Sequence, residues 1–137
     1  MYKTFTLNLV TPQKQLLSAL PVQSVVLPAL SGEMGVLAGH IPMVVQLGFG
    51  SLRYTSQETT KEFAVMGGFA EILHDTINVF AEGADLADEI DEEEEKQKIK
   101  RAKESLSRKD ADIDFELAEL EIKQALARMK VKKRHLG

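Results

Sequence analysis

Apolar and polar residues alternate along the first part of the chain in several short stretches. Residues 5–9 read Phe-Thr-Leu-Asn-Leu, with the period of two that is typical of a half-buried β-strand. Further short apolar runs follow at residues 23–30, 42–47, 51–56, 61–66, 69–73 and 76–82. Candidate turns separate them at Gly48 and Gly50, residues 57–60, Gly67-Gly68 and residues 74–75. The pattern predicts an all-β sandwich, with a barrel as the alternative. The Gly67-Gly68 pair indicates a tight hairpin or a close approach of two backbones.

The pattern becomes helical after Gly83. Neither Gly nor Pro occurs from Ala84 to Leu136, a length that sheets with turns rarely allow. Asp88 is the expected N-cap of a first helix, whose apolar stripe consists of Ile99, Ala102 and Leu106. A second helix has the candidate caps Asp110, Asp112 and Asp114 and one apolar side made of Phe115, Leu117, Ala118, Leu120, Ile122, Ala125, Leu126 and Met129. We therefore predict an antiparallel two-helix hairpin after the sandwich.

Charge is distributed unevenly along the 137 residues, whose formal net charge is −4. Residues 85–95 hold 8 acidic side chains and no basic one, whereas the chain from Ile122 onward holds 6 basic and no acidic ones. This asymmetry predicts two parts with different roles, a sandwich domain over residues 1–84 and a helical hairpin over residues 85–137. Such a hairpin buries little by itself, so we expect it to pack against another surface and to serve a conformational role.

The composition argues against several classes of protein. The chain has no Cys, so we expect neither disulfides nor a thiolate metal site, in keeping with a reducing compartment. The first residues match neither a secretory signal nor a transit peptide, and no apolar segment approaches the ~20 residues that span a bilayer. We expect a cytoplasm-facing chain without direct membrane insertion.

The stretch SGEMGVLAGHIPMV, residues 31–44, combines three glycines with a glutamate, a histidine and a proline. It lacks the G-x-x-x-x-G-K-[ST] and G-x-G-x-x-G spacings of phosphate-binding loops. A metal site needs several converging ligands, and His40, His74 and His135 are scattered. A Glu33–His40 acid–base pair is the remaining catalytic candidate, and spacing alone gives it little support. We therefore predict no catalytic residues and no metal site.

The basic end of the chain reads KQALARMKVKKRHLG over residues 123–137. Basic runs bind nucleic acid in some proteins, but this chain is acidic as a whole and has no aromatic residue among the basic ones for base stacking. The alternatives are a solvated helix end stabilised by its own dipole and a cationic helix that binds an acidic protein surface. We predict no nucleic-acid partner.

Three stretches together resemble one family over essentially the whole chain. Residues 31–44 carry a G-x-[hydrophobic]-G…[GN]-H-x-P pattern, FAVMGGFAEIL contains paired glycines, and DIDFELAELEIKQALARMKV reads as a charged second helix. In this order and spacing they resemble the ε subunit of bacterial F-type ATP synthase, whose mitochondrial counterpart is called δ. The resemblance implies a non-catalytic subunit of the rotor, in the central stalk.

In that family the sandwich docks on the γ subunit and the glycine loop lies on the c-subunit ring. The resemblance implies ring contacts by Gly32, Glu33, Met34, Gly35, His40 and Pro42. The family's hairpin inhibits ATP hydrolysis when it extends along γ, where its basic second helix meets the β and α subunits and an acidic motif on β. The matching residues here are Lys123, Arg128, Lys130, Lys132, Lys133 and Arg134.

Some members of the family also bind ATP in the folded hairpin, through an [IL]-D-x-x-R-A motif and further arginines. Here Glu94 and Glu95 stand at the Arg and Ala positions of that motif, and Gln124 replaces another arginine. The matching residues that remain are Asp91, Arg101 and Arg128. A carboxylate beside a polyphosphate removes charge-assisted contacts worth about 1.5–3 kcal/mol each. We therefore expect no cofactor and weak or absent ATP binding.

The resemblance implies a peripheral location on the cytoplasmic face of the bacterial inner membrane, within the ATP synthase complex. Two other interpretations stay open. One is a β-sandwich adaptor that recruits partners through a static helical hairpin, and the other is a small enzyme that uses His40 and Glu33. Binding to γ and the ring separates the rotor subunit from the adaptor, and a turnover that depends on either side chain would indicate the enzyme.

Overall fold

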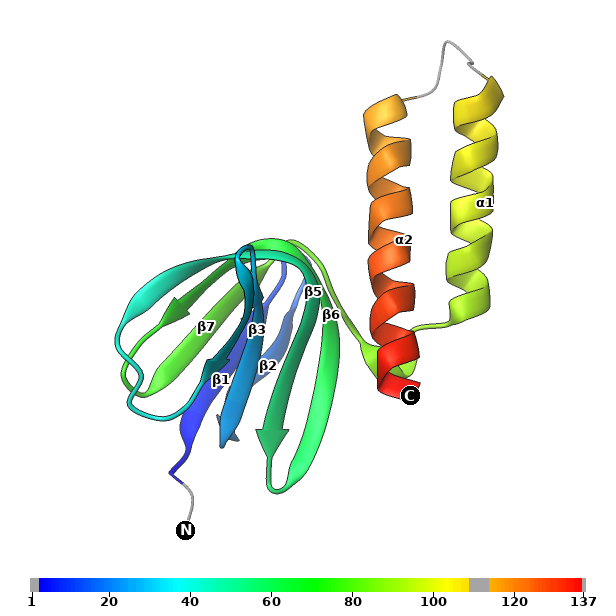
Figure 1. Cartoon of the computed structure of the whole chain (residues 1–137). Coiled ribbons are helices and arrows are strands. Elements are labelled where there is room, and N and C mark those ends of the chain that lie inside the picture. The colour runs from blue at the N-terminus through cyan, green and yellow to red at the C-terminus, as the bar shows by residue number, and fades with distance from the viewer. Residues whose placement is uncertain (1–2, 109–113, 137) are drawn as a thin grey trace. The chain divides into compact units, whose positions relative to one another are not determined.

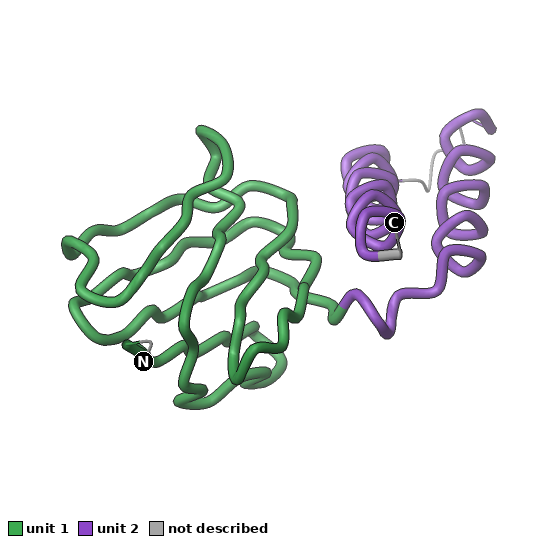
Figure 2. The backbone as a smooth tube through the Cα atoms, turned by 60° about the horizontal axis from the view of Figure 1, so that its bottom comes forward, with its two compact units in different colours: residues 1–86 green, residues 87–137 purple. Residues whose placement is uncertain are grey.

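The structure, a computed structural model, describes residues 3–108 and 114–136, the last of these by its backbone only. The chain divides into two compact units, Met1–Leu86 and Ala87–Gly137 (Figure 2). The division falls after residue 86, whereas the charge pattern placed it after residue 84. Residues 84–86 form a last short strand that pairs with the sheet and therefore belongs to unit 1.

Unit 1 is one hydrogen-bonded sheet (Figure 1). Its strands are β1 (Phe5–Val10), β2 (Gln15–Val22), β3 (Ser24–Ala29), β4 (Gly32–Val36), β5 (Met43–Ser56), β6 (Thr59–Ile72), β7 (Thr76–Ala81) and β8 (Ala84–Leu86). They lie in the order β2-β1-β7-β6-β5-β3-β4, and β8 pairs with β6. The paired strands are antiparallel except β1 and β7, which are parallel.

The two longest strands turn this sheet into a sandwich. β5 and β6 pair along their whole length, from Met43 opposite Ile72 to the turn that joins them. Residues 68–72 of β6 pair with β7, and residues 63–65 of the same strand pair with β8. The pairing of β3 with β5 is interrupted by a shift in register. Figure 1 shows both long strands bending, so that a single sheet covers two sides of one core. The predicted β-sandwich is confirmed.

Alternation along the strands builds the core. In β1 the side chains of Phe5, Leu7 and Leu9 are buried, while the residues between them are only half-buried. The same cluster includes Val22, Val25, Leu27, Val45, Leu47, Leu52, Tyr54, Phe63, Val65, Ile72, Ile77 and Val79. Burial of each Val, Leu or Ile side chain contributes about 1.5–3 kcal/mol. All members of the cluster come from unit 1, so the sandwich has a hydrophobic core of its own.

Two predicted turns are wrong. Gly48 and Gly50 lie inside β5, and Gly67-Gly68 lies inside β6, so that four predicted short strands form two long ones. The close backbone approach expected at the paired glycines is confirmed, because β7 passes directly beside Gly68. The turn predicted over residues 57–60 is present at residues 57–58, since Thr59 and Thr60 already pair within β6, and the turn at 74–75 is present as predicted. Strands β2, β4 and β8 lie where the pattern predicted no strand.

Unit 2 is the predicted two-helix hairpin, preceded by a short 3-10 helix. Its elements are η1 (Ala87–Glu89), α1 (Glu92–Arg108) and α2 (Phe115–Leu136). The N-cap of α1 is Asp91 and not the predicted Asp88, because Asp91 Oδ1 accepts the N–H groups of Glu93 and Glu94 at 2.9 and 3.3 Å. Asp88 lies in η1 instead.

The start of α2 matches one of the three candidate caps. Asp114 Oδ1 accepts the N–H of Leu117 at 3.1 Å, as an N-cap does. The other two candidates, Asp110 and Asp112, lie outside the described residues. An aspartate that accepts from the first turn also places negative charge at the positive end of the helix dipole.

The apolar side of α1 is as predicted, whereas that of α2 is narrower than predicted. Ala102 on α1 and Ala118 and Ala125 on α2 are buried, and the helices lie side by side (Figure 1). On α1 the predicted stripe is present, since its other two members are half-buried. On α2 part of the predicted side is between 41% and 53% exposed, namely Phe115, Leu117, Leu120 and Leu126. These residues fall on both sides of the line through Ala118 and Ala125, so a single neighbouring helix leaves them uncovered.

Candidate functional site

The first part of the glycine-rich stretch is a strand and not a loop. Gly32, Glu33, Met34 and Gly35 belong to β4, which ends the strand order and pairs with β3. Met34 packs against the core. The Glu33 carboxylate accepts two hydrogen bonds from the guanidinium of Arg53 on β5, with Nη2–Oε2 at 2.7 Å and Nη1–Oε1 at 3.2 Å.

This bidentate pair fixes the position of Glu33 on the surface of the sheet. The hydrogen bond from Arg53 to Glu33 raises the pKa of the guanidinium, and this effect exceeds the opposing one of desolvation. Both groups reach solvent, so the pair contributes at most about 1 kcal/mol to stability. Glu33 is held by an arginine, whereas His40 contacts its own backbone neighbour, and each residue of the acid–base candidate is therefore engaged elsewhere.

The second part of the stretch, residues 37–42, connects β4 to β5. Gly39 has a φ of 80°, and its N–H donates to the carbonyl oxygen of His74 at 3.3 Å, which ties the connection to the turn between β6 and β7. His40 Nδ1 lies 2.8 Å from the carbonyl oxygen of Ile41, and Pro42 is exposed just before β5. The six predicted ring-contact residues are thus divided between an edge strand and this connection.

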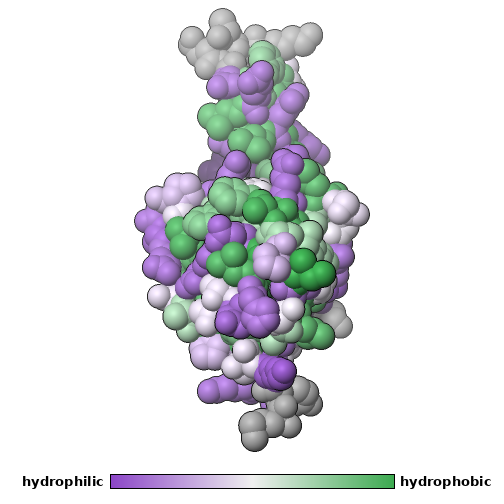
Figure 3. Space-filling model, turned by 90° about the vertical axis from the view of Figure 1, so that its left-hand side faces the viewer, coloured by the Kyte–Doolittle hydropathy of each residue, from purple (hydrophilic) through white to green (hydrophobic). Residues whose placement is uncertain are grey.

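Apolar side chains are exposed at this end of the sandwich. They are Leu37, Ile41, Met43, Val44 and Leu73, and we call them the end surface. Ile41 is 77% exposed and Val44 69%, and Figure 3 shows hydrophobic side chains gathered on this side of the sandwich. Exposed apolar side chains that gather in one place mark an interaction site. The sequence contained the signal in the apolar residues around His40.

A second apolar surface was not predicted from the sequence. Phe69 on β6 and Phe80 on β7 are paired across the strands and stack with their ring centroids 4.9 Å apart, although they are 47% and 40% exposed. They line an open hollow of about 340 Å³, together with Val10, Thr11, Pro12, Gly68, Ala81 and Glu82. We call Val10, Pro12, Phe69 and Phe80 the aromatic surface.

The signal for the aromatic surface lay in the strand pattern. Ala70 and Ile72 on β6 are buried, as are Ile77 and Val79 on β7, so both phenylalanines occupy alternate positions that face away from the core. Two aromatic rings on the outer side of a sheet expose apolar area without a structural role in the core. The pairing of β6 with β7 brings them together, and register is not readable from the alternation alone.

The basic residues of α2 do not form one uniform surface. Lys123, Lys130, Lys133 and Arg134 are exposed, whereas Arg128 and Lys132 are half-buried and bind groups near the start of unit 2. Arg128 Nη1 lies 3.4 Å from Glu95 Oε2 on α1, and Lys132 Nζ donates to the carbonyl oxygen of Ala87 at 3.1 Å. Only part of the predicted basic run therefore projects to solvent in this conformation.

The three residues that match the family's ATP site have different surroundings. The Asp91 carboxylate caps α1, Arg101 lies on the exposed side of the same helix, and Arg128 is bound by Glu95. Glu95 is only 4% exposed and stands where the ATP-binding motif has alanine. A carboxylate already occupies the position beside Arg128, and this geometry supports our expectation of weak or absent ATP binding.

The remaining two histidines each contact a single aspartate. His74 lies 2.9 Å from Asp75 in an exposed turn, and His135 contacts Asp88 in unit 2. Within the part of the chain that the structure describes, no three His, Cys, Asp or Glu side chains are grouped as metal ligands. In the same part, neither helix is long and apolar enough to cross a membrane.

Both units match models of one protein family. Residues 4–87 match the β-sandwich domain of the ATP synthase delta/epsilon chain, and residues 88–133 match the long α-helix domain of the same chain. The ATP synthase epsilon chain of Elusimicrobium minutum is 45% identical over 109 residues, which cover 80% of this chain and 81% of that protein. The ATP synthase epsilon chain of Syntrophobacter fumaroxidans is 39% identical, with 96% of this chain and 97% of that protein covered.

Solved structures share the fold. One match is a chain in a structure of the OSCP, F1 and c-ring part of the Euglena gracilis mitochondrial ATP synthase. It superposes with a TM-score of 0.74 at 26% identity, and the match covers 98% of this chain and 82% of that one. A chain from the central stalk and c-ring of the Tetrahymena thermophila mitochondrial ATP synthase shows the same fold at 13% identity, with a TM-score of 0.58. Two domain matches in the right order, relatives of nearly equal length and the shared fold agree, and the chain therefore belongs to the delta/epsilon chain family of ATP synthase.

Proposed function

We propose that the chain is a non-catalytic rotor subunit of a bacterial F-type ATP synthase, which couples the central stalk to the c-subunit ring and inhibits ATP hydrolysis through its hairpin. The observation that carries this proposal is the match of both units to the two domains of one ATP synthase subunit family. In this proposal the subunit is peripheral and lies on the cytoplasmic face of the inner membrane. It carries no cofactor of its own.

The sandwich supplies two docking surfaces in this proposal. The end surface faces the c-subunit ring, with His40 and Pro42 beside it and the β4 residues Gly32, Glu33, Met34 and Gly35 along the neighbouring edge. The aromatic surface binds the γ subunit, because stacked exposed rings around an apolar hollow are suited to a permanent protein contact. The two phenylalanines of the aromatic surface lie on the paired strands β6 and β7, whereas the end surface consists of the start of β5 and of the connections that follow β4 and β6.

The basic helix supplies the inhibitory contact in this proposal. Lys123, Lys130 and Arg134 are spaced by seven and four residues, so they share one side of α2, and Lys133 lies beside them. These cations would meet carboxylates on the β and α subunits and hinder rotation in the hydrolytic direction. An electrostatic contact of this kind weakens as ionic strength rises.

The experiment that tests this contact neutralises exposed lysines on α2. We expect the double variant Lys130→Gln, Lys133→Gln to relieve inhibition, so that the reconstituted catalytic complex hydrolyses ATP about three to five times faster than with the unchanged chain. Added salt should accelerate the complex with the unchanged chain more than the variant complex, because fewer charge pairs remain to be screened. Steady-state hydrolysis rates at low and high salt measure both effects.

The matched control removes two exposed lysines from α1. Lys100→Gln, Lys103→Gln makes the same change in net charge on the other helix of the hairpin and should leave the rate near that of the unchanged chain. Equal acceleration by both double variants would mean that net charge, and not the position on α2, controls the rate. That result would contradict the proposed contact.

A further inference from the structure

Three side chains of α2 bind the segment that starts unit 2. Arg128, Lys132 and His135 are spaced by four and three residues and therefore lie on one side of the helix. Arg128 binds Glu95, Lys132 donates to the carbonyl oxygens of Ala87 at 3.1 Å and Asp88 at 3.4 Å, and His135 Nε2 contacts Asp88 Oδ1. We call these contacts the base clasp, because they join the end of α2 to η1 and the first turn of α1.

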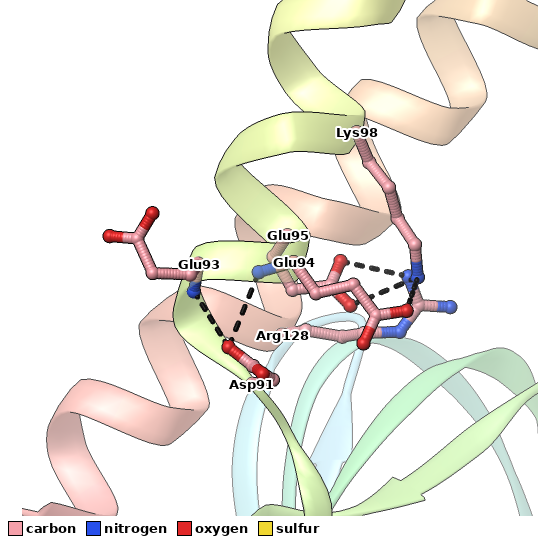
Figure 4. Close-up of polar contacts among 6 residues, drawn as sticks. All are labelled: Asp91, Glu93, Glu94, Glu95, Lys98 and Arg128. Atoms are coloured by element: carbon pink, nitrogen blue, oxygen red, sulfur yellow. Dashed lines mark hydrogen bonds and ion pairs between the residues drawn. The ribbon is translucent and has the colours of Figure 1, made fainter.

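Glu95 is the buried member of the base clasp. It is 4% exposed, and each of its carboxylate oxygens has a cation, with Arg128 Nη1 3.4 Å from Oε2 and Lys98 Nζ 3.2 Å from Oε1. Figure 4 shows Lys98 from α1 and Arg128 from α2 converging on this carboxylate. The carboxylate of the neighbouring Glu94 is exposed and lies 3.7 Å from the same Lys98 Nζ. A buried charge thus holds the two helices together.

The clasp makes separation of the helices costly. A carboxylate away from water is stable only while its cations stay in place, and removing one partner of such a pair leaves an uncompensated charge. When α1 and α2 stay together, Arg128 and Lys132 are engaged inside the hairpin. When they separate, both cations and the Glu95 carboxylate become available to water or to another protein.

We propose that the base clasp is an autoinhibitory lock within the hairpin: while it is closed, it withholds Arg128 and Lys132 of α2 from any other protein. Glu95 competes with any acidic partner for Arg128, and the hairpin closes on its own carboxylate without a bound anion. The existence of an acidic partner for α2 rests on the function proposed above, whereas the lock itself is a property of the isolated chain. Opening the clasp extends the cationic surface of α2 from the exposed lysines to Arg128 and Lys132.

The test measures the separation of the helices in the isolated full-length chain. The chain has no Cys, so cysteines at the exposed positions Gln97 on α1 and Lys130 on α2 can carry a pair of nitroxide labels without removal of a native thiol. Pulsed electron–electron double resonance then gives the distribution of distances between the labels. We expect one short distance for the unchanged hairpin. Glu95→Gln should reduce the ratio of closed to open molecules about tenfold, since Arg128 is partly solvated and the full effect of a buried pair is not reached.

Two comparisons isolate the pair. Glu94→Gln removes the same charge one residue away and should leave the distance distribution unchanged. Arg128→Gln should open the hairpin like Glu95→Gln, and the double variant should be about as open as either single one, because the second change removes a contact that is already lost. The lock is refuted if Glu95→Gln keeps the closed distance, or if the two changes add as independent effects. For variants whose helices unfold, the same comparison of the two single variants with the double variant is made from the melting temperature of the helical circular dichroism signal.

Hydrolysis by the reconstituted complex separates the lock from the proposed function. If both hold, Glu95→Gln deepens inhibition, because more of the hairpins are open and able to bind. An opened hairpin with an unchanged rate supports the lock and contradicts the inhibitory role of α2. A hairpin that stays closed contradicts the lock, whatever the rate.

Discussion

Replacement of Gly68 with alanine is expected to lower the free energy of unfolding of the sandwich by about 3–5 kcal/mol. A Cβ atom at this position would lie 2.1 Å from the carbonyl oxygen of Phe80 and 2.9 Å from the Cα of Ala81, both backbone atoms of β7. The φ of Gly68 is +111°, a value that residues with a side chain rarely adopt. Relief of the clash requires β6 and β7 to separate where their pairing begins.

Urea unfolding followed by tyrosine fluorescence measures this effect in the sandwich. The chain has no Trp and two Tyr, and Tyr54 is buried in the core of unit 1. Gly35→Ala is the matched control, because no atom lies within 4 Å of a Cβ at Gly35 and its φ is ordinary. The control should change the stability by less than about 0.5 kcal/mol. Equal midpoints for both variants would mean that β7 does not approach β6 as the structure shows.

The change Phe69→Asp is expected to weaken binding to the γ subunit at least about 100-fold. The ring lies on the outer side of β6, stacked on Phe80 and beside an apolar hollow, where an interface would bury it. A carboxylate there would lose the aromatic contact and would have to be desolvated without a partner. The fold should persist, since Phe69 is 47% exposed and lies outside the core cluster.

Titration of γ with labelled variants measures this affinity. Ile41→Asp is the control, because it places the same charge on a residue that is 77% exposed at the end surface, which we assign to the ring. We expect this variant to bind γ normally and to fail only in assemblies that contain the c-subunit ring. Normal γ binding by Phe69→Asp would show that the aromatic surface serves another partner or none.

The sequence predicted the kinds of element and their order more reliably than their extent. Alternation located β1, a short apolar run between candidate turns located β7, and the absence of Gly and Pro after residue 83 located the helices. Glycines inside β5 and β6 gave the same signal as turns, because a residue without a side chain permits both a turn and a bend within a strand. Which of the two occurs depends on pairing with distant strands, and a local pattern contains no information on that pairing.

Charged residues explain the remaining differences within the hairpin. Asp88 and Asp91 lie three residues apart in an acidic run, and each can cap a helix, so the pattern did not decide between them. Glu95 reads as a solvated residue of the same run, and its burial depends on Arg128, which is 33 positions later. Contacts between the helices, rather than the composition of either one, determine where these side chains lie.

The central claim is that the hairpin of this subunit inhibits ATP hydrolysis while the sandwich alone suffices for assembly. Truncation after Leu86 leaves every strand and the whole core cluster in place, including β8, and removes η1, α1 and α2. The decisive measurement compares ATP hydrolysis by the catalytic complex reconstituted with the full chain and with residues 1–86. We predict that hydrolysis is at least about threefold faster without the hairpin, while both forms bind γ equally well. Equal rates at equal binding would contradict the inhibitory role, and failure of both forms to bind γ would contradict the proposed rotor function.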